Sequence, residues 1–362
     1  MEFGLKIIII LDGIAEDRLS HASTTLELAY TPFLDKIAQK STCGLFCPVD
    51  SRLHMVKTEL VIASLLGIRP QLWPGRAYFE VLYNEPRSIP PKACSFIRYK
   101  SIGEKDGKVV ESHLIKQASF FSSLAQSYGV QIRVRPHQQT ASSHLAWVRD
   151  KKLSPKDAME QIKFMFAKIL NVFPQNIHAV LDEEWFGDPI QMKSFCKKPC
   201  FIAHTQNALG GLCQAAGIEV IPPNGHPLDF NNNRRLFQQI EQYLANSDYN
   251  CSIIYCKSTD WASHHGDRVL KKKTIEFIDS WLQQIISPLL GNPSNSIFVL
   301  SDHRTNIASE QASMNDSIFM TYNNGKGISK FCEKAIEQQW TRKPLSLDDL
   351  FYLFFNSPDS PW

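Results

Sequence analysis

The chain has 362 residues, of which 43% are hydrophobic and 21% charged, and its formal net charge is +3. This composition is that of a folded globular protein long enough for two domains, and it excludes a disordered chain. The charge is too small and too evenly spread to predict nucleic acid or an anionic membrane as a partner, which leaves small molecules or another protein.

The N-terminal apolar run lies between Lys6 and Asp12. It is shorter than the ~7 to 15 residues of a signal-peptide core and far short of the ~20 that a membrane span needs. We therefore expect no secretion signal, no membrane segment and a cytoplasmic protein.

Nine cysteines, an odd number at irregular spacings, also suit a reducing compartment better than a disulfide framework. Two pairs, Cys43 with Cys47 and Cys196 with Cys200, have spacings compatible with a four-cysteine zinc site. The segment CGLFC, however, has the pattern of a strand, in which cysteine is a common small core residue. The strand interpretation is favoured over the zinc site.

Taken in order, the first half of the core alternates strands and helices. Residues 6 to 13 (KIIIILDG) predict a buried strand, and an amphipathic helix begins at about Pro32. A strand over Gly44 to Val49 follows. Thr58 then has the position of a helix N-cap, and Gly67 that of the C-terminal stop of the same helix.

From Ile89 to Phe195 the pattern changes to alternating strands with two helices, over Lys116 to Tyr128 and Pro155 to Leu170. This stretch predicts an inserted α+β region, with strands in CSFIRYKSI, KVVESHL, VQIRVRP and HLAWVRD. Alternation of strand and helix then resumes, with helices over Asn233 to Leu244 and Val269 to Ile286.

Acidic and imidazole side chains follow three strand-like runs. Asp12 ends the first, Asp260 follows SIIYCKST with His264 four residues later, and Asp302 and His303 end IFVLS. Because the carboxyl ends of parallel strands share one edge of a sheet, these groups are expected to meet there. They are ligands suited to Mn, Mg or Zn, and two ions roughly 4 Å apart would clamp a phosphoryl group.

Each residue has a structural explanation of its own. Asp12 before Gly13 suits a turn, and Asp260 with His264 suits a helix cap with a surface histidine. Thr58 needs no chemistry beyond capping, although the positive end of a helix dipole is also a natural anion site. The joint occurrence of the ligands at strand ends favours a metal site over three separate structural roles.

Seven motifs occur in order: Asp12-Gly13, TPFLDKIA, LLGIRP, GRAYFEVL, GGLCQAAGIEVI, KSTDWASHHGD and SDHRT. With them the chain resembles, over nearly its full length, the archaeal-type cofactor-independent (2,3-bisphosphoglycerate-independent) phosphoglycerate mutases of the alkaline phosphatase superfamily. The resemblance implies an α/β fold, with an alkaline-phosphatase-like three-layer core and a mostly parallel sheet over residues 1 to 88 and 193 to 362. It implies that residues 89 to 192 form a smaller inserted α+β domain, a lid that holds the glycerate end of the substrate.

The resemblance also implies a site for one or two divalent ions, Mn, Zn or Mg, and a small phosphorylated metabolite as substrate. Asp260 and His264 would hold one ion, and the other would be held by Asp12, Thr58, Asp302 and His303. Thr58 takes the position of the family's nucleophilic serine. A threonine alkoxide is chemically competent for phosphoryl transfer.

Several positions depart from the family pattern. Glu59 replaces an aspartate, and Ser313 stands where a histidine ligand of the second ion is expected, with His265 as an alternative ligand. The lid segments ESHLIK (111 to 116) and TASSHL (140 to 145) lack the arginines that bind phosphate and carboxylate bidentately. Arg76 is the anion contact that remains.

Two functions follow from these observations. The first is a metal-dependent phosphoryl-transfer enzyme, a phosphomutase (an isomerase) or a phosphatase, with Thr58 as nucleophile and a substrate other than, or broader than, phosphoglycerate. The alternative is a degenerate homologue that keeps the fold and at most one metal ion and serves as a binding or scaffolding protein. Ser313 separates them, because a lost ligand favours the second. The sequence does not predict an oligomeric state.

Overall fold

The computed structural model describes the following residues: 4–19, 22–49, 58–66, 78–79, 82–83, 94–101, 130–135, 143–148, 179–187, 201–203, 207–220, 230–245, 251–322, 327–355 and single positions between 123 and 164. The chain forms two compact units. The first comprises Met1–Gln71, Lys193–Thr205 and Ala216–Trp362, and the second comprises Leu72–Met192 and Gln206–Ala215. We describe each unit by itself.

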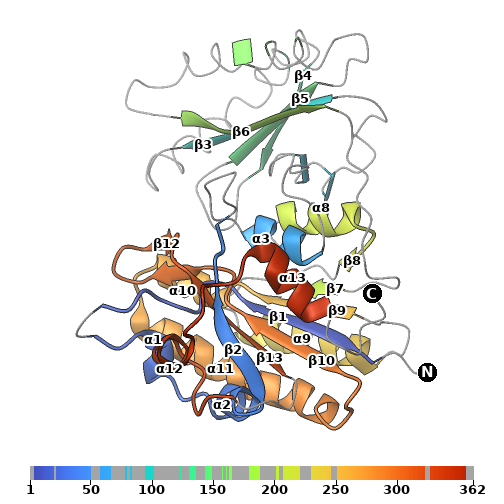
Figure 1. Ribbon diagram of the computed structural model, residues 1–362. Helices are drawn as coiled ribbons and strands as arrows, with labels where there is room; N and C mark the ends of the chain where they lie inside the picture. Colours follow the sequence, from blue (N-terminus) through green and yellow to red (C-terminus); the bar gives the residue numbers. More distant parts are fainter. Residues whose placement is uncertain are drawn as a thin grey trace. The chain divides into compact units, whose positions relative to one another are not determined.

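A seven-stranded sheet forms the centre of the first unit, in the order β2-β13-β10-β1-β9-β7-β8 (Figure 1). Strands β10, β1, β9, β7 and β8 are parallel, whereas β13 is antiparallel to both of its neighbours. The strands are β1 (Lys6–Leu11), β2 (Ser41–Phe46), β7 (Phe201–Ala203), β8 (Glu219–Val220), β9 (Cys251–Cys256), β10 (Ser296–Leu300) and β13 (Ser317–Tyr322).

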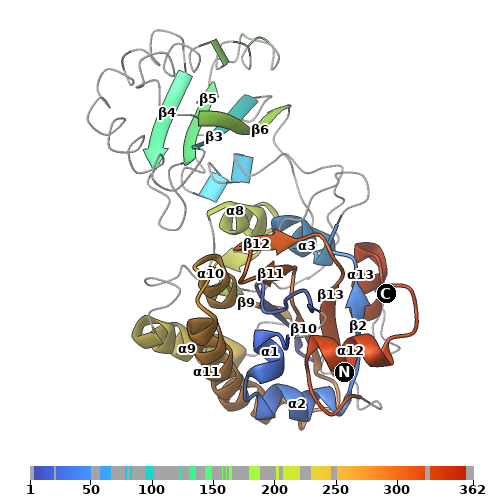
Figure 2. The same cartoon turned by 90° about the vertical axis from the view of Figure 1, so that its left-hand side faces the viewer.

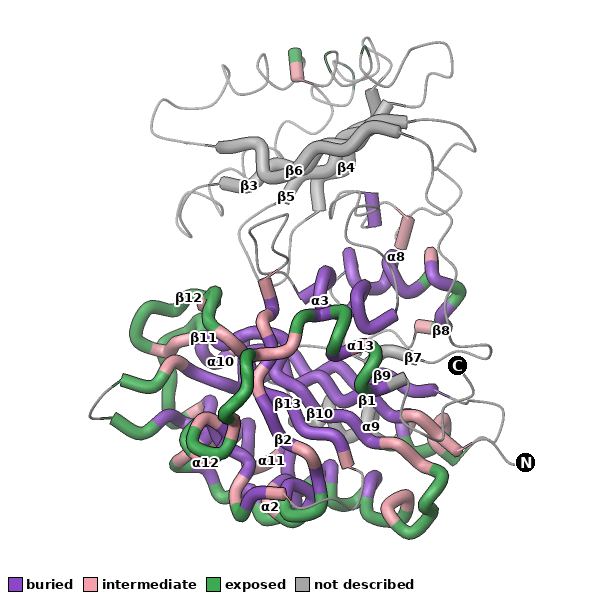
Figure 3. The backbone as a smooth tube through the Cα atoms, in the orientation of Figure 1, coloured by how far each residue is buried: buried purple, intermediate pink, exposed green. Residues whose placement is uncertain are grey.

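Strand β1 shows why the sheet is covered on both faces. Its residues from Ile7 to Leu11 are all fully buried, so both faces of the strand need apolar cover. On one face Ile7 and Ile9 belong to a core that includes Phe33 of α2 and Ile278 of α11. Figure 3 shows this buried centre of the sheet in purple.

The helices complete three layers. The face with Ile7 is covered by α1 (Thr25–Leu28), α2 (Pro32–Ala38), α9 (Phe230–Ala245), α11 (Arg268–Ile286) and α12 (Glu333–Gln339), most of which Figure 2 shows together. On the other face Phe354 of α13 (Leu347–Phe355) packs on Phe298 of β10, with ring centroids 5.1 Å apart, and α13 also contacts α3 (Thr58–Leu65). The predicted three-layer α/β core with a mostly parallel sheet is confirmed.

Helix α11 shows how sequence sets these bounds. Its N-cap Asp267 accepts a hydrogen bond from the backbone N–H of Leu270 at 2.8 Å. Buried Ile275, Ile278 and Leu282 recur at helical spacing and fix the face that packs on the sheet. The predicted helix from Val269 therefore begins one residue earlier, at Arg268.

Other predicted elements differ more. Strand β2 begins at Ser41 rather than Gly44, because it pairs with β13 from Ser41 to Phe46. Neither β13 nor β6 (Ala179–Gly187) was expected from the sequence. The predicted strand KVVESHL lies outside the described residues, as do most of the helices predicted over Lys116 to Tyr128 and Pro155 to Leu170.

The second unit contains a four-stranded antiparallel sheet in the order β4-β5-β3-β6. Its remaining strands are β3 (Cys94–Ser101), β4 (Val130–Arg135) and β5 (Ser143–Val148), and it also includes helix α8 (Asn207–Ala215). The role of residues 89 to 192 as a lid stays a prediction. None of the helices in the described part of the chain has the length and apolarity needed to cross a membrane.

Candidate metal centre

Three neighbouring parallel strands deliver the predicted ligands to one edge of the sheet. Asp12 follows β1, Asp302 and His303 follow β10, and Asp260 lies in α10 (Ser258–His264), two residues into the helix that follows β9. All four residues are buried, with exposed fractions of 0 to 6%. The structure therefore brings together residues that are about 250 to 290 positions apart in the chain because β9, β1 and β10 are adjacent.

Three of these residues gather most closely. Ligand atoms of Asp12, Asp260 and His303 all lie within 4.8 Å of one another, and among the described residues no other His, Cys, Asp and Glu side chains gather in this way. His303 Nε2 lies 3.1 Å from Asp12 Oδ1 and 3.4 Å from Asp302 Oδ2. The closest set of ligand atoms thus includes Asp260. The resemblance instead assigns Asp260 to the other ion and places Asp302 with Asp12.

Thr58 joins the group through Asp302. It is the first residue of α3, and its hydroxyl donates a hydrogen bond of 2.5 Å to Asp302 Oδ2. All eight residues of α3 are buried, Glu59 among them, so the helix holds the hydroxyl on a rigid support. The predicted nucleophile and the predicted ligands are therefore in contact.

The second predicted ion has fewer candidate ligands, namely Asp260 and His264. His264 Nε2 lies 3.3 Å from Asp260 Oδ1, and its Nδ1 lies 2.6 Å from the carbonyl oxygen of Glu310. The neighbouring His265 stacks on Trp261 at 4.1 Å between ring centroids and contacts the Trp261 carbonyl through Nδ1. His265 is therefore engaged by its own helix through its ring face and Nδ1.

Ser313 lies at the end of β12 (Gln311–Ser313), which pairs with β11 (Arg304–Asn306). Its hydroxyl accepts a hydrogen bond from the backbone N–H of Asn315 at 3.1 Å and also bonds to Asp17. The serine at the position where a histidine ligand is expected is thus hydrogen-bonded to Asn315, which follows the hairpin, and to Asp17 in the loop after β1.

Lys257 is the main residue that sequence reasoning missed. Its ammonium Nζ lies 2.9 Å from Asp12 Oδ2 and 2.9 Å from Asp260 Oδ2, and so bridges two carboxylates assigned to different ions. Tyr255 also donates a hydrogen bond to Asp12 Oδ2. The signal for Lys257 was its place directly after β9 and three residues before Asp260, in the motif KSTD.

The carboxylates raise the pKa of both Lys257 and His303. Burial alone would lower the pKa of the Lys257 ammonium, but Asp12 and Asp260 outweigh burial and raise it. Burial would also lower the pKa of His303, whereas the charges of Asp302 and Asp12 raise it to about 10. Both groups are therefore cationic at neutral pH when no metal ion competes for the carboxylates.

The carboxylates titrate apart from one another. Burial opposes ionisation of Asp12 and Asp260, but the charge of Lys257 overcomes it and lowers the pKa of each, in Asp260 well below the usual range. Burial, together with the charge of Asp12, raises the pKa of Asp302 to about 7. In the metal-free site, Asp302, which bonds to Thr58, therefore holds a proton more readily than Asp12 or Asp260 does.

Gly13 shows how tightly this edge is packed. Its φ of +58° is a left-handed conformation that favours glycine. A Cβ atom there would lie 2.3 Å from Thr305 Oγ1 and 2.8 Å from Asp260 Oδ1. The Thr305 hydroxyl in turn donates to Asp260 Oδ1 at 2.7 Å, so residue 13 must be glycine if Asp260 is to keep its place.

The group has the side chains to hold a divalent ion. Asp12 is completely buried, and its Oδ1 lies 3.1 Å from the Nε2 atom of His303. A buried carboxylate oxygen is costly unless a cation satisfies it; without a metal the imidazolium of His303 does so, and a divalent ion would do so with His303 as a neutral ligand. Carboxylate and imidazole ligands suit Mn, Mg and Zn alike.

Several predicted residues cannot be placed at this centre. Arg76 and the segments ESHLIK and TASSHL lie outside the described residues. Cys43 and Cys47 are free thiols, and Cys43 is buried, which raises the pKa of its thiol to about 12. Their supposed zinc partners, Cys196 and Cys200, also lie outside the described residues.

Comparison with known proteins places this geometry in a family. The model of the Metalloenzyme superfamily matches residues 6–321. The 2,3-bisphosphoglycerate-independent phosphoglycerate mutase of Thermoplasma volcanium is 24% identical over 83% of this chain and 83% of its own length. The corresponding mutase 1 of Methanocaldococcus jannaschii is 23% identical over 85% of each chain.

Two solved structures share the fold. The PH0037 protein from Pyrococcus horikoshii has a TM-score of 0.75 at 17% identity and covers 98% of this chain and 97% of its own. The cofactor-independent phosphoglycerate mutase from Thermoplasma acidophilum has a TM-score of 0.59 at 17% identity and covers 96% and 98%. The alkaline-phosphatase-like α/β fold predicted from the sequence is thereby confirmed. The chain belongs to the Metalloenzyme superfamily, as a divergent relative of the archaeal 2,3-bisphosphoglycerate-independent phosphoglycerate mutases.

Proposed function

We propose that the protein is a metal-dependent phosphoryl-transfer enzyme that acts on a small phosphorylated metabolite with Thr58 as its nucleophile. The observation that carries the proposal is the 2.5 Å hydrogen bond from the Thr58 hydroxyl to Asp302. It sets a hydroxyl within a buried group of carboxylate and imidazole side chains of the kind that bind divalent ions. Membership of the Metalloenzyme superfamily supports the use of a divalent ion.

Asp302 is suited to take the proton of the nucleophile. Thr58 Oγ would attack the phosphorus of the substrate while its proton passes to Asp302. The bond from phosphorus to the leaving oxygen would break, and that oxygen would keep the electron pair and take a proton from water, which releases the alcohol. Asp302 Oδ2 already accepts the hydrogen bond of this hydroxyl, so the proton has a short path to the carboxylate. The divalent ion, when bound, would supply Lewis-acid stabilisation of the alkoxide and of the phosphoryl oxygens.

We propose a single ion, held by Asp12, Asp302 and His303 beside Thr58. Lys257 occupies the space between Asp12 and Asp260 and supplies a fixed positive charge that would attract the phosphoryl oxygens. The commitment of Ser313 to Asp17 supports one ion rather than two, because the pair of Asp260 and His264 then lacks a third protein ligand.

For the substrate, we propose a phosphomonoester other than, or broader than, phosphoglycerate. The relatives are phosphoglycerate mutases by name, but residues 111 to 116 and 140 to 145 of this chain contain no arginine to grip a glycerate carboxylate. A phosphatase needs no such grip, whereas a mutase must hold the glycerate while the phosphoryl group moves. Mutase turnover on the order of 10 per second or more would contradict this proposal.

One observation favours the alternative, a degenerate homologue that serves as a binding or scaffolding protein. Lys257 and His303 are both cationic in the metal-free cluster and can balance Asp12 and Asp260 without an ion. In that case the buried charges would be purely structural, and removal of the Thr58 hydroxyl would affect only the helix.

The test uses two substitutions at Thr58 and a generic substrate, p-nitrophenyl phosphate with Mn. Thr58→Ser keeps the hydroxyl and its bond to Asp302, so we expect activity to be retained or raised. Thr58→Val keeps the shape but removes the nucleophile, so hydrolysis should fall by about 100-fold or more. Its cost to the free energy of unfolding should be about 1 to 2 kcal/mol, from the lost hydrogen bond to a buried carboxyl group.

The two variants separate chemistry from structure. If Thr58→Val hydrolyses p-nitrophenyl phosphate as fast as the parent, Thr58 is only a structural residue and the scaffolding alternative becomes the better account. If parent and variants are all inactive with Mn, Mg and Zn, the enzymatic proposal itself is wrong.

A further inference from the structure

The Thr305 side chain of β11 lies beside residues assigned to both ions. It is completely buried. Its hydroxyl donates a hydrogen bond to Asp260 Oδ1 at 2.7 Å, and its Oγ1 lies 3.0 Å from His303 Nδ1. A single hydroxyl group thus links a carboxylate from α10 with an imidazole that follows β10.

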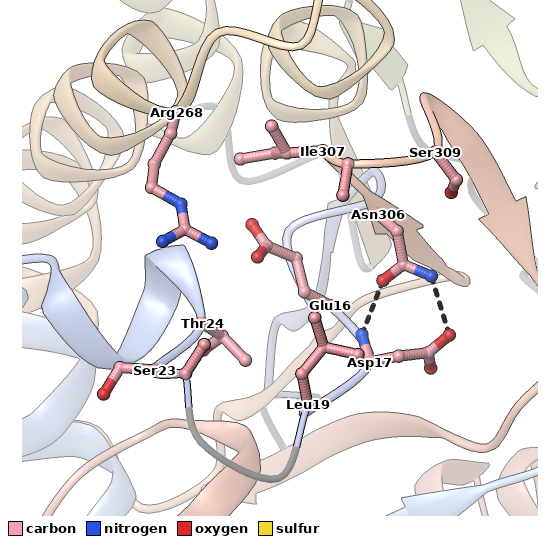
Figure 4. Close-up of a pocket in the computed structure, with 11 residues that line it drawn as sticks. Glu16, Asp17, Leu19, Ser23, Thr24, Arg268, Asn306, Ile307 and Ser309 are labelled. Atoms are coloured by element: carbon pink, nitrogen blue, oxygen red, sulfur yellow. Dashed lines mark hydrogen bonds between the residues drawn. The ribbon is translucent and has the colours of Figure 1, made fainter.

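Hydrogen bonds anchor the backbone around Thr305. Its N–H donates to the Ala15 carbonyl at 2.9 Å, and its own carbonyl accepts from Lys271 Nζ at 3.2 Å. The side chain of the next residue, Asn306, accepts from the backbone N–H of Asp17 at 2.7 Å and donates to Asp17 Oδ2 at 2.7 Å (Figure 4). Strand β11 is therefore tied to the loop after β1, and the Thr305 hydroxyl has a rigid support.

The contacts of His303 Nδ1 decide whether this nitrogen carries a proton. The Thr305 hydroxyl has a single proton, which it donates to Asp260, so towards His303 it can only accept. Asp260 cannot supply the proton instead, because its other oxygen pairs with the Lys257 ammonium at 2.9 Å, which keeps it ionised. The second neighbour of Nδ1 is the Arg304 carbonyl oxygen at 3.3 Å, which also only accepts. Nδ1 therefore carries a proton.

The opposite ring nitrogen of His303 faces the other ligands. Nε2 lies 3.1 Å from Asp12 Oδ1 and 3.4 Å from Asp302 Oδ2. A histidine binds a metal ion through a nitrogen without a proton, and the hydrogen bond of the other nitrogen sets which one that is. Because Nδ1 keeps its proton, Nε2 is the nitrogen that can release its proton and bind an ion.

We infer that Thr305 is a positioning residue of the metal centre, whose hydroxyl orients the His303 ring so that Nε2 faces the ion. The inference rests on the metal-dependent function proposed above. The same hydroxyl holds Asp260, so the direction of the imidazole and the place of this carboxylate depend on one side chain. Loss of hydrogen-bond partners of this kind typically weakens metal binding by about 10- to 100-fold.

The first test is a calorimetric titration of the metal-free full chain with Mn. Thr305→Val keeps the shape of the side chain but removes the hydroxyl, and should weaken Mn binding by about 10- to 100-fold. Thr305→Ser keeps the hydroxyl and should bind Mn as the parent does. Thr274→Val is the matched control and should leave the affinity unchanged, since it removes a completely buried hydroxyl of α11 that donates to the Leu270 carbonyl at 2.8 Å.

The titration separates this inference from the proposed function. If the parent binds no Mn, the metal centre itself is wrong and the inference falls with it. If the parent binds Mn and Thr305→Val binds it equally well, the centre stands and the inference alone is wrong. Equal weakening in Thr305→Ser and Thr305→Val, or in Thr274→Val, would trace the loss to packing and would also overturn the inference.

The second test observes the His303 ring by nitrogen-15 NMR, with its signals assigned by their loss in His303→Gln. Zn is added in place of Mn because it is diamagnetic. With Zn, the parent and Thr305→Ser should carry a proton on Nδ1 and none on Nε2. A Zn-loaded parent with its ring proton on Nε2 would overturn the inference, whatever the fold of Thr305→Val.

The same spectra of the metal-free protein report on the hydrogen bond without any ion. The Nδ1 proton should exchange with water about tenfold faster in Thr305→Val than in the parent, because it has lost its closer acceptor. Equal exchange rates would assign the orientation of the ring to the Arg304 carbonyl and would contradict the role of Thr305.

Discussion

The first unit contains two buried groups of charged residues, and their difference shows what marks a functional site. The metal centre gathers Asp12, Asp260 and Asp302 around Lys257 and His303. The second group lies beneath the loop after β1 and also contains buried acids and bases, namely Glu16, Lys271, Arg304 and Glu333.

The second group spreads its charges over backbone partners. Glu333 accepts hydrogen bonds from the backbone N–H of Glu16 at 2.8 Å and from the Thr24 hydroxyl at 2.7 Å. Lys271 donates to the Thr305 carbonyl at 3.2 Å, and Arg304 donates to the Glu16 carbonyl at 2.9 Å. These bonds tie loops to helices and need no further ligand, as expected of a structural network.

In the metal centre, by contrast, the carboxylates converge on one another. Two lysines make the contrast plain: burial lowers the pKa of Lys271 in spite of Glu16, whereas Asp12 and Asp260 together raise the pKa of Lys257. Buried charge alone therefore does not indicate catalysis. Convergence of several carboxylates on one point is the stronger indicator.

The largest effect should come from removing a ligand. Asp302→Ala takes away a carboxylate that contacts both His303 and Thr58, so we expect bound Mn to fall from about one ion per chain to nearly none. The rise in melting temperature that Mn causes in the parent should disappear with it. Metal content is measured by elemental analysis after dialysis, and melting by calorimetry.

Glu333→Gln is the matched control, since it removes a buried carboxylate from the structural group. It should retain the metal content of the parent. If both variants keep their Mn, or both lose it, the distinction between the two buried groups is wrong.

The next effect concerns the bridging lysine. Lys257→Met leaves Asp12 and Asp260 buried without their shared cation, which should cost about 3 to 5 kcal/mol of unfolding free energy in the absence of metal. Lys272→Met is the control, because Lys272 pairs with Glu276 at 3.6 Å on a half-exposed face and such pairs are worth about 1 kcal/mol or less. Urea denaturation of both variants measures the difference. Equal losses would mean that Lys257 is no more than a surface-type ion pair.

A smaller, pH-dependent effect should come from Glu333. Burial raises its pKa from 4.5 to about 7, so between these values the folded protein holds a proton that the unfolded chain has lost. Stability from this group is complete below pH 4.5 and falls as pH rises through 7, by about 3 kcal/mol at most. Glu333→Gln cannot titrate and should lose that slope in urea denaturation at pH 5, 6, 7 and 8. A variant with the slope of the parent would assign the pH dependence to other groups.

The sequence predicted those features that depend on continuous local patterns. The apolar run of β1 and the one that ends at Asp302 located two ligand-bearing strand ends, because central parallel strands are buried on both faces. The i and i+4 spacing of Asp260 and His264 likewise placed both on one side of α10. Local periodicity was sufficient for these residues.

What the sequence did not predict depends on tertiary contacts. Lysine usually lies at the surface of a protein, so the residue type gave no sign that Lys257 is buried. Only the adjacency of β1 and β9 places it between two carboxylates. Strand β13 has no alternation, because it lies inside the sheet between β10 and β2, where both of its faces are buried.

The central claim is that the strand ends form a centre for one ion. The most direct test is anomalous scattering at the manganese edge from crystals of the protein soaked in Mn. We predict one peak, in contact with Asp12, Asp302 and His303. A second peak between Asp260 and His264 would contradict the single ion and the role given to Lys257, and a crystal without any peak at these strand ends would contradict the metal centre.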